Sequence, residues 1–299
     1  MKKRLLFTGA TGFLGKNIKP LLLGSYEVTS LGASDRNDIK VNLAKDVPHL
    51  TSRFDVVLHA AGKAHTIPRT EAEAKEFYDV NYTGTVNLCS ALENSVTPNA
   101  FIFISTVAVY GLDYGENISE NEPLNGSTPY AVSKIMAEKY LSDWCSKHNV
   151  VLTILRPSLI AGPSAPGNLG AMVSGIRSGK YLSIAGGRAK KSVLMVQDLA
   201  RLVSLSADKG GIYNVCDDTQ PTFRQLESII ARQVGKSMPV SIPYWFAKCC
   251  ALAGDCLGRF APINSLKLDK ITKSLTFSNE RAKKTLDWNP TNVLENYLI

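Results

Sequence analysis

The feature that most constrains the fold is a glycine-rich segment near the N-terminus, TGATGFLG at residues 8–15. It follows an apolar run at residues 4–7 and opens a stretch of helical periodicity at 13–23. Three glycines spaced by three allow a tight turn, close backbone approach to a pyrophosphate and close helix–strand packing. The helix N-terminus adds N–H donors and the positive end of a dipole. The segment therefore predicts a dinucleotide-binding loop, with Gly9, Thr11, Gly12, Phe13, Leu14 and Gly15 contacting the ligand.

The rest of residues 1–160 alternates strand-like and helical patterns. Apolar runs at 4–7, 27–31, 55–59, 100–104 and 150–155 indicate buried strands, and 13–23, 70–92 and 129–148 have helical length and periodicity. This alternation predicts an α/β fold with a Rossmann-type doubly wound parallel sheet. After residue 157 a Gly/Pro/Ser-rich loop and shorter mixed elements follow. We expect residues 1–160 to form the nucleotide-binding domain and 161–299 a smaller substrate lobe, with some later segments returning to the main sheet.

Composition excludes several classes of protein. The chain has 299 residues, of which 44% are hydrophobic and 20% charged, as in ordinary globular proteins. No run of about 18 apolar residues occurs, and the basic N-terminus leads into glycines, so we expect neither a membrane span nor a signal peptide. The nearest approach, residues 242–257, is interrupted by Lys248 and Asp255. It predicts an amphipathic or buried helix, with a role at a membrane surface as the alternative.

The cysteine pattern and the net charge indicate the cellular compartment and the class of binding partner. Six cysteines are scattered without a CxxC pair or a histidine cluster, which favours reduced thiols in a cytoplasmic protein over disulfides or a metal site. The net charge of +8 favours anionic partners. Because the lysines are spread along the chain rather than grouped with aromatic residues, we expect nucleotide-like small molecules and no nucleic acid.

The end of the second predicted strand bears on the choice of cofactor. A site for NAD usually has an acid there to hold the ribose 2′-hydroxyl. Here the expected position is Gly32, while Arg36 could meet the 2′-phosphate of NADP. Asp35 could still serve the ribose if the strand is longer, and Arg36 could equally be a solvated loop charge. The sequence leaves NAD and NADP open.

A helix start at residues 127–134 carries candidate acid/base residues. Thr128 can cap this helix, and Pro129 suits its first position. Tyr130 and Lys134 are four residues apart and lie on one helical face. A phenol with a pKa near 10 is a poor base at neutral pH, and a neighbouring ammonium lowers that pKa. We predict that Tyr130 and Lys134 form the acid/base pair of a hydride-transfer enzyme.

The same spacing recurs at Tyr244 and Lys248, so spacing alone is a weak signal. Tyr244 begins an aromatic cluster at 244–246 with no hydroxyl-bearing strand end before it, which we interpret as helix packing. Tyr130 instead follows a strand at 101–104 that ends in Ser105 and Thr106.

With these residues assembled, the chain resembles an extended short-chain dehydrogenase/reductase of the nucleotide-sugar epimerase/dehydratase group. The resemblance covers nearly the whole chain. It is carried by TGATGFLG at 8–15, HAAG at 59–62, NYTGT with Asn81, FISTVAVYG at 103–111, YAVSK at 130–134 and RPSLIAGP at 156–163.

The resemblance implies roles for individual residues. Thr106 matches the family's catalytic Ser/Thr and would complete a triad with Tyr130 and Lys134. The cofactor would be NAD or NADP, contacted further by Arg36, Asn42, Leu43, Ala60, Ala61, Gly62, Asn81 and Pro157. The substrate would be a nucleotide-diphosphate sugar, most simply UDP-linked, held by Thr106, Asn168, Lys191 and Lys270. Relatives often dimerise through a four-helix face, so a homodimer is also expected.

The same pattern separates the reactions. The family's 4,6-dehydratases commonly place Asp-Glu after the catalytic Thr, whereas Val107 and Ala108 follow Thr106 here, so dehydration is not expected. The leading hypothesis is a UDP-sugar 4-epimerase acting by hydride transfer at sugar C4. The alternative is an NADPH-dependent UDP-4-keto-sugar reductase, favoured by Gly32, Arg36 and RPSLIAGP. A non-catalytic nucleotide-binding regulator would require a broken triad, and all three residues are present.

Overall fold

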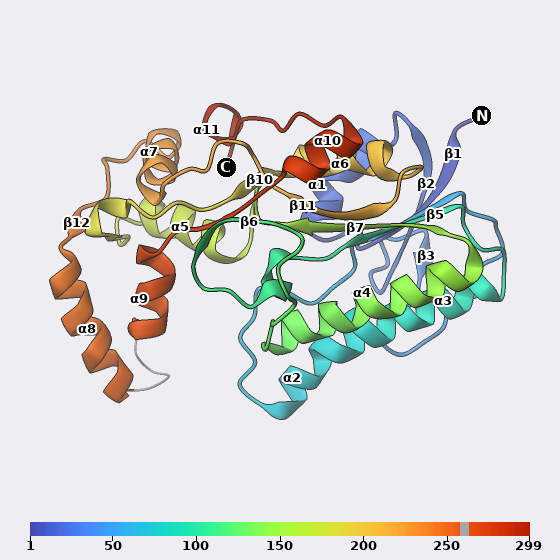
Figure 1. Cartoon of the computed structure of the whole chain (residues 1–299), viewed down its shortest axis with the longest axis horizontal. Helices are drawn as coiled ribbons and strands as arrows, with labels where there is room; N and C mark the ends of the chain where they lie inside the picture. The colour runs from blue at the N-terminus through green and yellow to red at the C-terminus, as the bar shows by residue number, and fades with distance from the viewer. Residues whose placement is uncertain (258–262) are drawn as a thin grey trace.

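A computed structural model describes residues 1–257 and 263–299 (Figure 1). Its centre is a seven-stranded sheet in the order β11-β7-β5-β4-β1-β2-β3, in which every neighbouring pair is parallel. The strands are β1 (Lys3–Thr8), β2 (Tyr26–Gly32), β3 (Ile39–Lys40), β4 (Val56–His59), β5 (Ala100–Ile104), β7 (Val151–Pro157) and β11 (Gly211–Val215). The strand order reverses between β1 and β4, which is the arrangement of a doubly wound sheet. The predicted Rossmann-type fold is confirmed.

Helices cover both faces of this sheet. On one side lie α1 (Phe13–Leu22), α6 (Val196–Ser206) and α10 (Glu280–Leu286), and on the other α3 (Gly84–Glu93) and α4 (Pro129–His148). Alternate strand residues face the two layers: Leu5 and Phe7 join the first core, and Leu6 joins the second. Both faces are therefore buried, as expected where strand sequences are apolar throughout.

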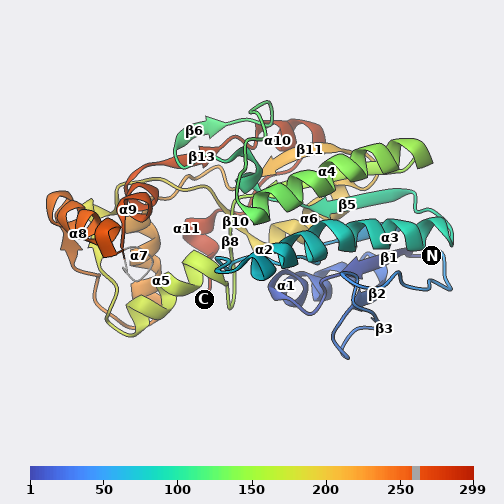
Figure 2. The same cartoon turned by 90° about the horizontal axis from the view of Figure 1, so that it is seen from below.

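The part of the chain outside the main sheet and its helical layers is built from short elements. Three two-stranded parallel sheets pair β8 (Leu159–Ala161) with β10 (Val193–Met195), β9 (Ser183–Ile184) with β12 (Ser241–Ile242), and β6 (Gly115–Ile118) with β13 (Leu275–Phe277). The helices of this part are α5 (Gly167–Arg177), α7 (Phe223–Gln233), α8 (Tyr244–Leu257), α9 (Ser265–Thr272) and α11 (Val293–Asn296). α8 and α9 lie at the end of the molecule away from the N-terminus (Figure 2).

β11 and α6, from beyond residue 160, belong to the main sheet and its helical layer, in line with the expectation that some later segments return there. The structure differs from the sequence expectation in two places. The helix expected over 70–92 is α2 (Glu71–Tyr78), a π-helical turn at Asp79–Thr83, and α3. The aromatic residues that open α8 do not pack inside: Tyr244, Trp245 and Phe246 are all exposed. Among the described residues, no helix is long and apolar enough to cross a membrane.

Candidate active site

The glycine loop lies at the carboxyl end of β1, beside the point where the strand order reverses. Gly9 has φ +81° and passes so close to β4 that a Cβ there would lie 2.7 Å from backbone atoms of Ala60 and Ala61. At Gly15 a Cβ would meet the Ala10 backbone at 2.3 Å, because α1 turns directly over the strand end. Glycine is therefore required at both positions.

The first turn of α1 is accessible to a ligand. Gly12 occupies the N-cap position, where no side chain caps the helix. Its unpaired N–H groups and dipole can bind an anion without competition from a protein side chain. The loop thus fits the pyrophosphate of a dinucleotide.

The end of β2 holds the residues that would meet the adenosine ribose. Gly32 is the last residue of β2, and Asp35 forms an exposed ion pair with Lys40 at 2.5 Å. Asp38 turns back to accept hydrogen bonds from the Ser30 N–H and hydroxyl, which lowers its pKa. Arg36 is exposed and forms no ion pair within the described part of the chain. The free guanidinium, rather than either carboxylate, is available to a ligand.

The end of β4 is fixed by buried hydrogen bonds. The Thr8 hydroxyl lies 2.6 Å from His59 Nδ1, and His59 Nε2 lies 2.9 Å from the Thr85 hydroxyl. The Ala61 N–H donates to Thr8 Oγ1 at 3.2 Å. Burial, with a smaller effect of Lys134, lowers the pKa of His59 to about 3, so the ring is neutral. His59, which the sequence reasoning used only as part of a motif, positions Ala60 and Ala61 against the glycine loop.

Asn81 sits in the π-helical turn and is fully buried. Its carboxamide accepts from the Lys63 N–H at 2.7 Å and donates to the Lys63 carbonyl and to Ser133 Oγ. Asn81 therefore joins the segment after β4 to α4 and holds Gly62 beside Lys134: a Cβ on Gly62 would lie 3.3 Å from the ammonium. Π-helical turns of this kind are frequent at functional sites.

Two predicted cofactor contacts, Asn42 and Leu43, lie after β3. Asn42 is exposed and its side-chain oxygen accepts from the Ala44 N–H. Leu43 is buried, and its carbonyl accepts from Asn87 Nδ2 at 2.7 Å. Pro157, at the end of β7, pairs with Val215 of β11 and is buried.

The side chains of Thr106 and Tyr130 are hydrogen-bonded to each other. Thr106 follows β5 and caps the 3₁₀ turn Val107–Tyr110 by accepting from the Ala108 N–H. Tyr130 is the second residue of α4, whose N-terminus Thr128 caps as predicted. Burial raises the pKa of Tyr130, and a hydrogen bond with the Thr106 side chain partly offsets that rise. The downward shift expected from Lys134 is not present in this structure.

Lys134 lies one helical turn further along α4 and is buried. Its Nζ donates to the Ile104 carbonyl at 2.8 Å and lies 4.5 Å from the centre of the Phe103 ring. Burial lowers the pKa of Lys134 to about 8, and Glu138 acts weakly in the opposite direction. A lysine held this way can exchange a proton near neutral pH and can donate to a ligand above Gly62.

Sequence reasoning missed a buried ionic network beneath this site. Glu138, the residue four after Lys134, forms an ion pair with Arg156 at 2.6 Å and accepts from the Ser105 hydroxyl. Arg156 also donates to Tyr110 Oη, which donates to Asn214. An acid at the (i, i+4) position from Lys134 was the available signal, but the other members of the network come from the end of β5, the 3₁₀ turn, β7 and β11.

The substrate-side lysines are brought together from distant parts of the chain. Lys191 is 8% exposed and donates to the Lys273 carbonyl at 3.0 Å, while Lys270 pairs with Asp113 at 3.1 Å. Burial lowers the pKa of Lys191 to about 8, opposed by Asp113 and assisted by Lys270. Lys191 and Lys270 therefore lie near each other beside Asp113 and are called the lysine cluster, whereas the Lys273 ammonium pairs with Asp269. Asn168, exposed on the first turn of α5, has no hydrogen bond or ion pair linking it to this cluster among the described residues.

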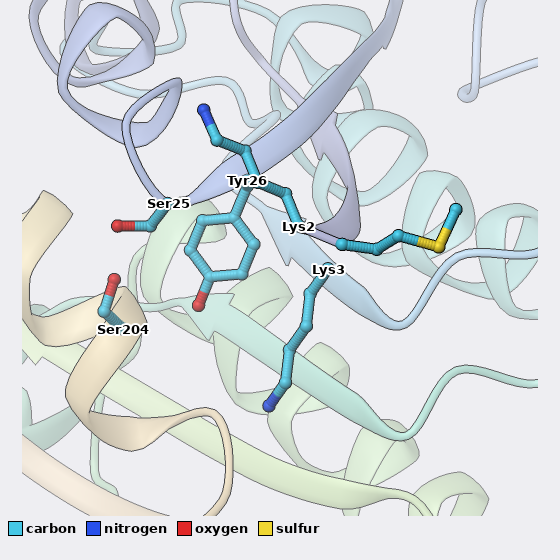
Figure 3. A pocket seen from close by; sticks show the side chains of 6 residues that line it. Lys2, Lys3, Ser25, Tyr26 and Ser204 are labelled. Carbon is cyan, nitrogen blue, oxygen red and sulfur yellow. The ribbon is translucent and has the colours of Figure 1, made fainter.

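Two hollows flank the molecule. A pocket of about 390 Å³ between the start of α8 and the end of α9 is lined by Ile184, Ala185, Arg188, Ala189, Tyr244, Ile271, Thr272 and Lys273. A larger one of about 610 Å³ lies beside Lys3, Tyr26 and Ser204 (Figure 3). The second is at the amino ends of β1 and β2, opposite the glycine loop, so it is not the cofactor site.

Comparison with known proteins identifies the family to which this chain belongs. The family model for the NAD dependent epimerase/dehydratase family matches residues 5–216. An N-acetyl-alpha-D-glucosaminyl-diphospho-ditrans,octacis-undecaprenol 4-epimerase of Escherichia coli O157:H7 is 27% identical, over 93% of this chain and 88% of its own length. A UDP-glucose 4-epimerase of Vibrio cholerae is 28% identical, over 99% and 93%. A GDP-6-deoxy-D-mannose reductase of Pseudomonas aeruginosa is 28% identical, over 77% and 80%.

Solved structures agree on the fold. A UDP-glucose 4-epimerase of Thermotoga maritima with UDP-glucose superposes with a TM-score of 0.74 at 21% identity, covering 98% of this chain and 95% of its own. A Pseudomonas aeruginosa protein complexed with NADPH gives a TM-score of 0.74 at 21% identity, covering 98% and 96%. Each superposition covers the main sheet and the smaller sheets together.

Proposed function

The chain belongs to the NAD dependent epimerase/dehydratase family, and from this premise we propose that it is a 4-epimerase of a diphosphate-linked sugar. It is an enzyme of that family, and its cofactor is a nicotinamide dinucleotide. The observation that carries the proposal is the meeting of Thr106 and Tyr130, with Lys134 one turn below, beside the glycine loop.

These side chains have complementary tasks at the sugar. Tyr130 acts as the phenolate to take the proton from the O4 hydroxyl and later returns that proton as the phenol, while the Thr106 hydroxyl holds the oxygen. The buried Lys134, whose Nζ lies beside Gly62, would donate a hydrogen bond to the bound ligand, and in this structure it does not lower the pKa of Tyr130. A nicotinamide dinucleotide bound at the glycine loop would supply the hydride acceptor and donor for C4. Epimerisation then requires the sugar to present its other face before the hydride returns.

The lysine cluster would hold the diphosphate. The positive charges of Lys191 and Lys270 lie near each other, and no acid other than Asp113 pairs with them among the described residues. A lysine acts as a point charge, so it recognises a diphosphate without dictating what the diphosphate carries. The two epimerase relatives differ in this respect, since one is named for a UDP-sugar and the other for an undecaprenol-linked sugar. We propose a UDP-sugar as the simplest substrate, with a lipid-linked diphosphate sugar as the second to be assayed.

A 4-keto-sugar reductase that consumes NADPH is the second candidate. The observation that favours it is Arg36, which is exposed and unpaired after β2, at the position suited to a 2′-phosphate. A reductase relative also exists at an identity similar to that of the epimerases. In this reaction the hydride goes to C4 of the keto sugar, and Tyr130 donates the proton to O4.

One experiment separates the two candidates. Purified protein is incubated with UDP-hexoses, UDP-N-acetylhexosamines and a polyprenyl-diphosphate N-acetylhexosamine, without added cofactor, and products are resolved by NMR. An epimerase converts at least one of them with bound cofactor alone. Activity only on a 4-keto sugar, with one NADPH oxidised per product, would contradict the epimerase. Tyr130→Phe should bind cofactor normally and lose turnover in either case.

Two further properties are part of the proposal. All six cysteines are free, three of them exposed, which fits a reducing compartment such as the cytoplasm. A homodimer remains an expectation that light scattering of the purified protein would test.

A further inference from the structure

In α8 the small residues are buried and the large apolar residues are exposed, which is the reverse of the usual arrangement in a globular protein. Its buried stripe consists of small residues, Ala247, Ala251 and Gly254, which face α9 and the end of β9. The opposite side carries its large apolar residues, although it faces solvent. Trp245 is 67% exposed, Phe246 47% and Leu252 53%.

The apolar surface is continuous along the helix. At 3.6 residues per turn, Trp245, Cys249, Leu252 and Cys256 fall on the side directly opposite the buried stripe, with Phe246 and Ala253 adjoining them. The two charged residues of α8, Lys248 and Asp255, lie on one flank together with Tyr244. Exposed apolar residues that stand singly need no explanation, but a contiguous row of them indicates a binding surface.

The sequence around this helix is basic. Residues 222–273 contain eight Lys or Arg against three Asp or Glu. Among the described residues, Arg224 pairs with Glu227, Lys270 with Asp113 and Lys273 with Asp269. One of the three acids, Glu227, is buried, and Asp255 accepts two hydrogen bonds from Ser265. Arg188 and Lys248 remain exposed near the start and along the flank of α8.

These observations distinguish between occupants. A second copy of the chain, docked symmetrically on α8, would bring two basic regions together and meet like-charge repulsion. An anionic lipid surface complements both features: the aromatic and aliphatic side chains enter the headgroup boundary, and the basic residues meet lipid phosphates. The aromatic residues sit at one end of a helix too short to span a bilayer, as in helices that lie on one.

We propose that α8 docks the substrate lobe on the surface of an anionic lipid bilayer. The helix lies in the plane of the membrane with Trp245, Phe246 and Leu252 inserted. The pocket between α8 and α9, which includes Tyr244 and Lys273, then opens close to the lipid surface. This inference concerns the helix alone and does not rest on the proposed reaction.

Vesicle co-sedimentation tests the proposal. The full chain is mixed with vesicles of phosphatidylethanolamine and phosphatidylglycerol and compared with the double variant Trp245→Glu/Leu252→Glu. The matched control, Leu21→Glu/Val96→Glu, changes two other exposed apolar residues, 52% and 48% exposed, on the Rossmann domain. We expect wild type and control to sediment with the vesicles, and the α8 variant to bind at least about tenfold more weakly.

Folding and assembly are monitored in the same samples. Circular dichroism and NAD binding should be unchanged in both double variants, because every substituted residue is on the surface. Failure of wild type to sediment with the vesicles, or equal binding by the two double variants, overturns the proposal. So does sedimentation equilibrium that shows a wild-type dimer dissociated only by the α8 substitutions in the absence of lipid, since α8 would then be an interface between copies.

Discussion

Replacing Lys134 by Met should change how the stability of the protein depends on pH. Burial lowers the pKa of Lys134 from its ordinary 10.5 to about 8. Below about pH 8 both the folded and the unfolded states carry the proton, and the folded state bears the full cost of burying the ammonium. Between the two values the unfolded chain binds more protons than the folded one. The stability of wild type must therefore rise with pH across this window.

The magnitude follows from the two pKa values. Their difference corresponds to a total of about 3 kcal/mol, of which about 2 kcal/mol is recovered between about pH 7 and about pH 9.5. Lys134→Met has no such group, and all other titrating groups are common to both proteins. We expect wild type to gain about 2 kcal/mol of unfolding free energy relative to the variant over that interval.

Urea unfolding at the two pH values measures this quantity, with the free energies extrapolated to water. Lys139→Met provides a matched control, because Lys139 is an exposed lysine on the same helix and should follow wild type. Parallel pH dependence of wild type and Lys134→Met would refute the reasoning, since it would mean that the Lys134 ammonium is as well solvated in the fold as in water.

Other consequences can be tested by substitution. Gly15→Ala should cost about 1–3 kcal/mol of stability and weaken NAD binding, because its Cβ would lie 2.3 Å from backbone atoms, whereas Gly24→Ala, with 3.7 Å to its nearest neighbour, should be nearly neutral by thermal unfolding. Glu138→Ala should cost about 3–5 kcal/mol in urea unfolding by leaving a buried guanidinium unpaired, against at most about 1 kcal/mol for Asp269→Ala in an exposed pair. Arg36→Ala should weaken NADPH binding about tenfold more than NADH binding by fluorescence titration; equal losses would exclude a 2′-phosphate contact.

Much of the site could be predicted because it depends on local geometry. Gly9, Gly12 and Gly15 act through a single turn between a strand and a helix, and Tyr130 and Lys134 share one helical face. Strands that are apolar throughout predict a sheet buried on both faces, and their alternation with helical segments predicts the Rossmann arrangement. In these cases the partners are near in sequence, and the rules that join them are steric.

Other features depend on which distant segments meet. Glu138 of α4 forms an ion pair with Arg156 of β7, and Lys191 donates to the Lys273 carbonyl 82 residues later in the chain. The direction of the Tyr130 pKa shift was also misjudged from sequence, since it depends on the depth of burial rather than on the spacing to Lys134.

The helix at residues 244–257 shows most clearly what the sequence determines and what only the tertiary structure decides. The sequence determined that it is apolar and helical, with small residues along one side and aromatic residues at its start. It could not determine which side is buried, because either face is apolar enough to pack. The tertiary structure decided that α9 covers only the small residues and leaves Trp245 and Leu252 exposed. Burial depends on whether another element reaches a surface, and that is a property of the assembled fold.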